Sequence, residues 1–283
     1  MRIEVNGVSL FFDIEGAKFV PDGPIMREKP TLILLHGAPG LSDHSSFKPL
    51  FGSLSDVAQI IYLDLRGCGR SDAGPAHLWT LHQWADDLRV FCDALDIQRP
   101  VVLGQSGGGF VAIAFGARHN RHAGKLVLAS TQARVLPQRI IDVVLRRASP
   151  AAGTAAKRWL AQPGDAQAFK GWRDHGLPLY NHEPQDPNGA KRTIFQMDTW
   201  GSFAQMWYRE GPDLLPEMAG ISCPTLILTG DDDPICPTED ADDMLAALRT
   251  GIGRLERFEH CGHGVWRDHP DRALQVLREF ILS

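Results

Sequence analysis

Short apolar runs alternate with longer amphipathic patterns along most of this chain. The runs lie within residues 31–35, 59–63, 100–103, 125–129 and 224–229. Short continuous apolar runs are typical of strands that are covered on both faces of a parallel sheet. Helical patterns cover 80–95, 238–248 and 267–282, and a further strand is expected at 254–258. Strands that alternate with helices predict an α/β fold.

The N-terminal residues show a different pattern, in which apolar and polar positions alternate. Val5 and Val8 flank Asn6-Gly7, a pair that favours the two-residue turn of a hairpin. We therefore expect antiparallel strands near 2–5 and 8–14. The Gly-, Pro- and charge-rich residues 16–30 are expected to form a loop. Thr80 and Gln83 have the spacing of a capping box at the start of the helix that follows.

A long segment interrupts the alternation of strands and helices. Residues 131–220 contain weak helical patterns broken by Gly and Pro, and no clear strand. A structureless loop of that length is implausible in a compact domain. We therefore expect a helical cap at 131–220 that covers one end of the sheet, and a core formed by 1–130 and 221–283.

Composition restricts the class of partner. The chain has 283 residues, 43% of them hydrophobic, and a formal net charge of −5. This balance argues against a nucleic-acid partner, and no apolar run approaches the ~18 residues of a membrane span. The cysteines form no CxxC pair, so no disulfide framework is expected. With the charged start Met1-Arg2-Ile3-Glu4, these features are typical of a cytoplasmic protein that acts on a small molecule, as a monomer or a homo-oligomer.

A candidate nucleophile lies between a predicted strand and a predicted helix. Gly104-Gln105-Ser106-Gly107-Gly108 has the pattern G-x-S-x-G, which is characteristic of a sharp turn that exposes a serine hydroxyl. The alternative is a glycine-rich turn with a buried serine. Because an oxyanion needs two N–H donors, we expect them to be the backbone groups of Gly107 and Ala38, which follows the strand 31–35. His36 in the same loop is expected to bond the loop backbone, or alternatively to be the base.

The acidic and basic partners of Ser106 are sought after the later strands. Asp233 follows the strand 224–229 and is the expected carboxylate, with Asp231 and Asp232 as alternatives. The same aspartates also fit a solvated helix-capping turn or, more weakly, a calcium site. His263, between two glycines, is the expected base, and His260 is the alternative.

Two further groups of residues carry possible chemistry. A zinc site would combine His260 and His263 with Cys236 and Cys261, although this spacing matches no usual zinc motif. We expect no metal and no cofactor. Aromatic cap residues are expected to line an apolar substrate pocket, although part of them serve only to pack the cap; these are Trp172, Trp200, Phe203 and Trp207.

With these motifs, residues 1–130 and 221–283 resemble the α/β-hydrolase superfamily, and within it the proline iminopeptidase-like group. That group carries H-G-G-P-G, D-Q-R-G-C-G-R-S and G-G-S-W-G motifs, to which residues 36–40, 64–71 and 104–108 are similar. The resemblance implies an eight-stranded, mostly parallel sheet with an N-terminal antiparallel hairpin, flanking helices and an inserted cap. It also implies that the Arg66-bearing turn braces the floor of the active site. The W-x-x-W-E stretch of true iminopeptidases has no counterpart, since Trp172 is followed by Arg173-Asp174.

The resemblance and the residues together predict a cofactor-free serine hydrolase. Ser106 would attack a carboxylic ester or amide of a small, largely apolar substrate, with His263 as base and Asp233 orienting it. Three alternatives stay open: a proline iminopeptidase-type aminopeptidase, a non-hydrolytic binding protein of the same fold, and an enzyme that hydrolyses C–C bonds or performs cofactor-free oxygenation.

Overall fold

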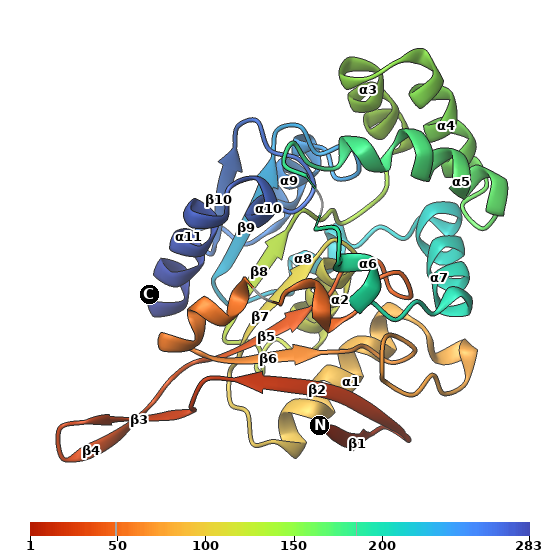
Figure 1. Cartoon of the computed structure of the whole chain (residues 1–283). Helices are drawn as coiled ribbons and strands as arrows, with labels where there is room; N and C mark the ends of the chain where they lie inside the picture. Colours follow the sequence, from red (N-terminus) through yellow and green to blue (C-terminus); the bar gives the residue numbers. More distant parts are fainter. Residues whose placement is uncertain (49, 185) are drawn as a thin grey trace.

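A computed structural model describes residues 1–48, 50–184 and 186–283 and shows one eight-stranded sheet. The order across the sheet is β1-β2-β6-β5-β7-β8-β9-β10 (Figure 1). The strands β5 to β10 run parallel, and β1 and β2 form the antiparallel edge. Their bounds are β1 (Arg2–Val5), β2 (Val8–Glu15), β5 (Thr31–Leu35), β6 (Gln59–Leu63), β7 (Val101–Gln105), β8 (Lys125–Ala129), β9 (Thr225–Gly230) and β10 (Gly253–Phe258). The predicted fold class is confirmed.

The hairpin turn between β1 and β2 has the backbone that its sequence predicts. Asn6 has φ +45° and Gly7 φ +77°, the left-handed pair of a tight two-residue turn. The loop predicted over residues 16–30 is wrong, because β3 (Phe19–Asp22) and β4 (Ile25–Glu28) pair as a separate hairpin. The proline and charged residues of this segment are typical of a loop, so the sequence pattern did not indicate these strands. They project from the body of the molecule in Figure 1.

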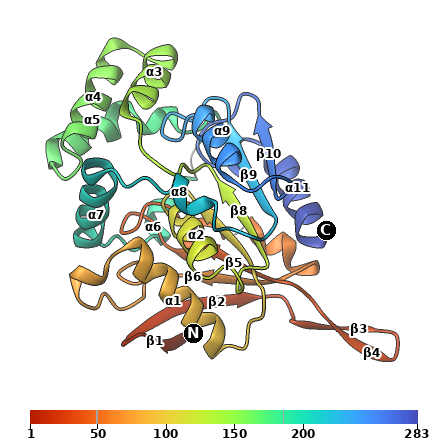
Figure 2. The same ribbon diagram turned by 180° about the vertical axis from the view of Figure 1, so that it is seen from behind.

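The central strands are buried on both faces, and alternate residues belong to two separate cores. In β5, Ile33 and Leu35 join one core, whereas Leu32 and Leu34 join the other. The helices α1, α2 and α9 cover the first face, and α11 with the 3-10 helix η2 covers the second (Figures 1 and 2). The core helices are α1 (Leu81–Ala94), α2 (Gly107–Arg118), α9 (Thr238–Ala247), α10 (Val265–Asp268) and α11 (Pro270–Leu282), with 3-10 helices η1 (His44–Ser46), η2 (Phe51–Asp56) and η3 (Ala76–Leu78).

The start of α1 agrees with the prediction, with Thr80 as its N-cap, whereas the start of the last helix differs. At α1 only half of the capping box forms: Gln83 N–H donates to Thr80 Oγ1 at 3.2 Å, but the Gln83 side chain donates to Asp87 instead. The last helix was expected from residue 267, yet it begins at Pro270 because the short α10 precedes it. Proline fits the first turn of a helix because the N–H groups there have no acceptor within the helix, so the N–H that proline lacks is not needed.

Residues 131–220, called the cap below, contain helices and no strand among the described residues. They are α3 (Pro137–Arg147), α4 (Pro150–Ala161), α5 (Ala166–His175), η4 (Leu177–Leu179), α6 (Gly189–Arg192), α7 (Met197–Ala204), the π-helix η5 (Gln205–Glu210) and α8 (Leu215–Met218). Most gather at one end of the sheet, while α8 packs against α2 and α9 (Figure 2). Across the described part of the chain, no helix is long and apolar enough to cross a membrane.

Candidate active site

Ser106 lies at the turn between β7 and α2 in a strained backbone conformation. Its φ is +50° and its ψ is −119°, a region that residues with a side chain rarely adopt. The end of the neighbouring strand β8 and the residues just after it hold this conformation, because Ser106 N–H donates to Ala129 O at 3.0 Å and Thr131 Oγ1 donates to Ser106 O at 2.7 Å. Strain of this kind persists only where surrounding contacts impose it, and it points the serine away from the sheet.

The glycines around Ser106 are required by close backbone approach. A Cβ on Gly104 would lie 2.3 Å from Gly108 O, and a Cβ on Gly108 would lie 2.3 Å from Leu35 O. Real Cβ atoms do not approach that closely. The strand-turn-helix unit therefore packs in this form only with glycine at both positions.

Two backbone N–H groups meet beside Ser106. Ala38 follows β5 with φ +32°, and Gly107 is the first residue of α2, where N–H groups have no partner inside the helix. A Cβ on Gly107 would lie only 2.9 Å from Ala38 N, so the two residues are in direct contact. Neither N–H has an acceptor among the described residues. The pair is thus free to bind a substrate oxygen.

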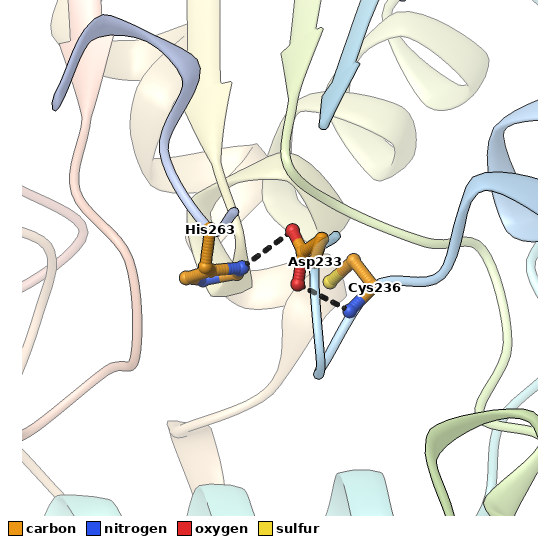
Figure 3. Close-up of side chains that lie close together, drawn as sticks. All are labelled: Asp233, Cys236 and His263. Carbon is orange, nitrogen blue, oxygen red and sulfur yellow. Dashed lines mark hydrogen bonds and ion pairs between the residues drawn. The ribbon is translucent and has the colours of Figure 1, made fainter. Parts of the chain in front are cut away.

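Asp233 and His263 form a buried hydrogen-bonded pair (Figure 3). Asp233 Oδ2 accepts from His263 Nδ1 at 2.8 Å, and the side chains are 0% and 7% exposed. Asp233 Oδ1 also accepts from Ile235 N–H and Cys236 N–H, each at 2.9 Å. These bonds fix the carboxylate, which in turn fixes the tautomer of His263 and leaves Nε2 available as a base.

The alternative residues lie elsewhere or have other partners. Asp231 and His260 are exposed, and Asp232 pairs with His182 at 2.9 Å. His36 bonds the loop backbone as expected, with Nδ1 facing Gly37 O at 3.0 Å and Nε2 accepting from the N–H of residue 65 at 3.3 Å. Burial lowers the pKa of His36, which keeps its ring neutral.

The groups of Asp233, Cys236 and His263 are close enough together to suggest a metal site. Their ligand atoms lie within 4.8 Å of one another. His263 Nδ1, however, donates a proton to Asp233, and burial raises the pKa of the Cys236 thiol well above its usual value. A metal would need both groups deprotonated. Their chemistry therefore favours a hydrogen-bonded pair, and the exposed His260 is not part of the cluster.

A cavity of about 970 Å³ lies between the core and the cap, and Ser106, His263, Ala38 and Gly107 all line it. Among the described residues Ser106 Oγ has no hydrogen-bond partner; catalytic hydrogen bonds of this type often tighten only when substrate binds. The predicted cap residues Trp172, Trp200 and Phe203 also line the cavity.

The prediction for Trp207 is wrong, because Trp207 does not line the cavity. It is fully buried behind Phe110, with ring centroids 3.5 Å apart. Phe110, in contrast, lines the cavity and was missed, although its place in the helix after Ser106 is a usable signal. Tyr180 was missed too: its carbonyl accepts from His263 N–H, and its ring lies 5.0 Å from the imidazole centroid. No local pattern in the sequence predicts that Tyr180 contacts His263.

The turn at residues 64–71 joins the core to the cap below the cavity. Thr199 Oγ1 donates to Gly67 O at 2.7 Å, and Gln196 Nε2 donates to Gly69 O at 3.2 Å. Within the turn, Arg66 forms a buried, bidentate ion pair with Asp87 of α1, at 2.7 and 2.8 Å. Arg66 does not line the cavity, so its role is structural: it holds the turn against α1.

This fold and these motifs identify the chain as a member of the alpha/beta hydrolase fold family, whose model matches residues 30–270. The chain is accordingly a hydrolase, and its predicted likeness to the proline iminopeptidase-like group is confirmed. A proline iminopeptidase of Lactobacillus helveticus (strain DPC 4571) is 27% identical over 269 residues, 90% of each chain.

Solved structures agree on the fold. A thermophilic esterase from Thermogutta terrifontis superposes with a TM-score of 0.69 and 25% identity, over 99% of this chain and 98% of that chain. A proline iminopeptidase of Mycobacterium smegmatis superposes with a TM-score of 0.78 at 17% identity, over 99% of this chain and 97% of that chain. Esterase and peptidase structures are thus both similar to this chain.

Proposed function

We propose that the chain is a serine hydrolase that cleaves a carboxylic ester or amide through an acyl-enzyme on Ser106. The observation that carries this proposal is the pairing of His263 Nδ1 with the buried Asp233 at 2.8 Å, on the wall of the cavity that also holds Ser106. A hydroxyl, an oriented imidazole and two free N–H groups are the parts that acyl transfer requires.

In the first half-reaction Ser106 Oγ attacks the acyl carbonyl carbon while His263 Nε2 takes the hydroxyl proton. Asp233 stabilises the imidazolium that forms. The carbonyl oxygen becomes an oxyanion, which accepts hydrogen bonds from the N–H groups of Ala38 and Gly107. The tetrahedral intermediate then expels the alcohol or amine, and His263 returns the proton to that leaving group.

In the second half-reaction water attacks the ester bond of the acyl-enzyme. His263 Nε2 takes a proton from this water, and the same two N–H groups bind the second oxyanion. Expulsion of Ser106 Oγ, which regains its proton from His263, releases the carboxylic acid and restores the enzyme.

The walls of the cavity suit a small, largely apolar acyl or leaving group. A volume of about 970 Å³ lies at the upper end of the range for small-molecule sites. Much of the wall is aromatic. The cavity is lined by Phe110 of α2 and by the cap residues Trp159, Phe169, Trp172, Trp200, Phe203 and Tyr208. Phe203 lies next to the N–H groups of Ala38 and Gly107, since a Cβ added to Gly107 would lie 3.3 Å from Phe203 Cζ.

A second candidate function is that of an aminopeptidase. Relatives at 27% identity over 90% of the chain are proline iminopeptidases. Glu183 lines the cavity and makes no ion pair within the described residues, so it offers a carboxylate to a free amine. The absence of a W-x-x-W-E stretch, with Arg173-Asp174 after Trp172, argues against this candidate.

The variant Ser106→Ala tests the mechanism. We expect kcat for p-nitrophenyl acetate to fall by at least about 10⁴-fold and labelling by a fluorophosphonate probe to disappear. The control is Ser202→Ala, an exposed serine of α7 outside the cavity wall, which is expected to keep both properties. Unchanged turnover in Ser106→Ala would refute the mechanism.

A substrate panel separates the two candidates. Short acyl esters and prolyl naphthylamide are compared by kcat/KM in the same preparation. Faster turnover of esters supports the esterase, whereas faster turnover of the prolyl amide would establish the aminopeptidase in its place.

A further inference from the structure

The charged side chains on the cavity wall differ in whether they have a partner. These side chains are Lys48, Arg173, Glu183, Asp186, Arg192 and Arg267. Most of them form ion pairs: Lys48 with Asp13 and Glu15, Arg173 with Asp174, and Arg192 with Asp186. Within residues 1–48, 50–184 and 186–283, Arg267 is the wall cation that has no carboxylate partner.

Arg267 lies close to the reacting groups. It belongs to α10, four positions after His263, and its Nε would lie 3.5 Å from a Cβ on Gly264. Its Nη1 reaches Asn181 Oδ1 only at the long distance of 3.5 Å. Asp268, the next residue, accepts backbone hydrogen bonds from residues 182, 183 and 262 instead. Arg267 is exposed to solvent. Desolvation by the protein around it nevertheless lowers its pKa, and the nearby charge of Asp268 offsets this only in part.

A second donor beside Arg267 also has no partner. Gln105, directly before Ser106, is 4% exposed, lines the cavity, and makes no side-chain hydrogen bond within the described residues. Its Nε2 would lie 3.1 Å from the same Cβ position on Gly264. Buried side-chain amides nearly always have a hydrogen-bond partner. Gln105 and Arg267 therefore converge next to His263, and both are free to bind a ligand.

We propose that the substrate carries a carboxylate, which Arg267 and Gln105 bind while Ser106 attacks an ester or amide carbonyl elsewhere in the molecule. This inference rests on the proposed function and specifies its substrate class. A guanidinium fork matches the two oxygens of a carboxylate, and one cation balances a monoanion. The same cation repels a free amine placed beside it, whereas Glu183 elsewhere on the wall, unpaired among the described residues, would attract one.

Half-esters of dicarboxylic acids test the inference. Monomethyl succinate, glutarate and adipate are compared with their dimethyl esters, which have the same scissile bond but no charge. We expect kcat/KM of the best monoester to exceed that of its dimethyl ester by at least about tenfold. In Arg267→Gln this ratio falls at least tenfold, through KM of the monoester, and Arg267→Lys retains part of it. Arg146→Gln, which alters an exposed arginine of α3 outside the cavity wall, is the control and leaves the ratio unchanged.

Binding without chemistry separates this inference from the proposed function. Calorimetric titration of Ser106→Ala with the same esters is expected to show tighter binding of the monoester, and loss of that difference in Ser106→Ala/Arg267→Gln. Equal affinities for monoester and dimethyl ester would overturn the inference even if wild-type esterase activity stands. If wild type hydrolyses neither ester while the Arg267-dependent binding persists, the proposed function fails and the carboxylate site stands. Tighter binding of a phosphonate of equal length would overturn the assignment to carboxylate.

Discussion

The buried ion pair between Arg66 and Asp87 offers the sharpest test of what the turn at 64–71 does. The side chains are 1% and 3% exposed and are joined by two hydrogen bonds of 2.7 and 2.8 Å. Asp87 also accepts from the side chains of Asn6 and Gln83, each at 2.9 Å. The variant Asp87→Ala removes all four bonds and leaves a charged guanidinium in the protein interior.

The expected loss in the free energy of unfolding depends on the charge that stays behind, which in Asp87→Ala is the guanidinium of Arg66. Removing one partner of a buried pair typically lowers the free energy of unfolding by about 3–5 kcal/mol, because the other charge stays desolvated and unpaired. At roughly 2–4 °C per kcal/mol, Tm is expected to fall by roughly 6–20 °C. The double variant Arg66→Met/Asp87→Leu removes both charges. Its loss is expected to be smaller than the sum of the single losses, by about 2 kcal/mol or more.

Thermal unfolding followed by tryptophan fluorescence measures these shifts, and fluorophosphonate labelling of the folded fraction reports on Ser106. The matched control is Asp93→Ala in the same helix, because the exposed Asp93 pairs with Arg89 one turn away at the surface, where an ion pair contributes about 0–1 kcal/mol. Two results would refute the reasoning: a loss below 1 kcal/mol in Asp87→Ala, or a well-folded Arg66→Met that no longer labels. The second would make Arg66 part of the chemistry.

Three further predictions follow from the site. Asp233→Asn should lower kcat for p-nitrophenyl acetate by about 10⁴-fold, while Asp232→Asn stays within a few-fold; equal losses would mean that the carboxylate is misassigned. Gly108→Ala should lower Tm through a loss of about 1–3 kcal/mol, since its Cβ would lie 2.3 Å from Leu35 O, whereas Gly164→Ala, with nothing within 4 Å, should change Tm little. Burial lowers the folded-state pKa of His36, so the unfolded chain binds more protons below about pH 6.5. Stability should therefore be lost as pH falls from about 6.5 through the folded-state pKa, by at most about 1.4 kcal/mol per pH unit from this group; urea unfolding at several pH values should show a shallower slope in His36→Gln.

The sheet and the order of its elements could be predicted because they depend on local patterns. Continuous apolar runs mark strands such as Leu32–Leu35, whose alternate residues join two cores. Asn6-Gly7 marks a left-handed backbone conformation that most residues avoid, and the glycines at 104 and 108 mark close backbone approaches that a side chain would block. The strands at 19–22 and 25–28 were not recognised because they pair with each other in solvent: Phe19, Ile25 and Met26 are exposed and form neither a continuous apolar run nor an alternating pattern.

Pairing in space could not be predicted in the same way. Asp233 was the expected carboxylate and does contact His263, but Asp231 and Asp232 stayed open as alternatives because composition does not distinguish neighbours in a run of three aspartates. Trp207 was expected on the cavity wall, but the Phe110 ring stacked against it lies there instead, because only packing decides which ring faces the cavity. The number of aromatic residues in the cap predicts an apolar cavity wall, but it does not show which of these residues line the cavity.

The same distinction explains why the reaction is easier to infer than the substrate. Ala38, Ser106, Asp233 and His263 follow β5, β7, β9 and β10, so the carboxyl edge of a parallel sheet brings them together whatever the cap contains. Substrate choice depends instead on which polar groups of the wall are left without partners, and sequence cannot tell Arg267 from the paired Arg192. Because an unpaired guanidinium is stabilised most by an anion that enters the cavity, substrates of this chain should be sorted by charge before they are sorted by size.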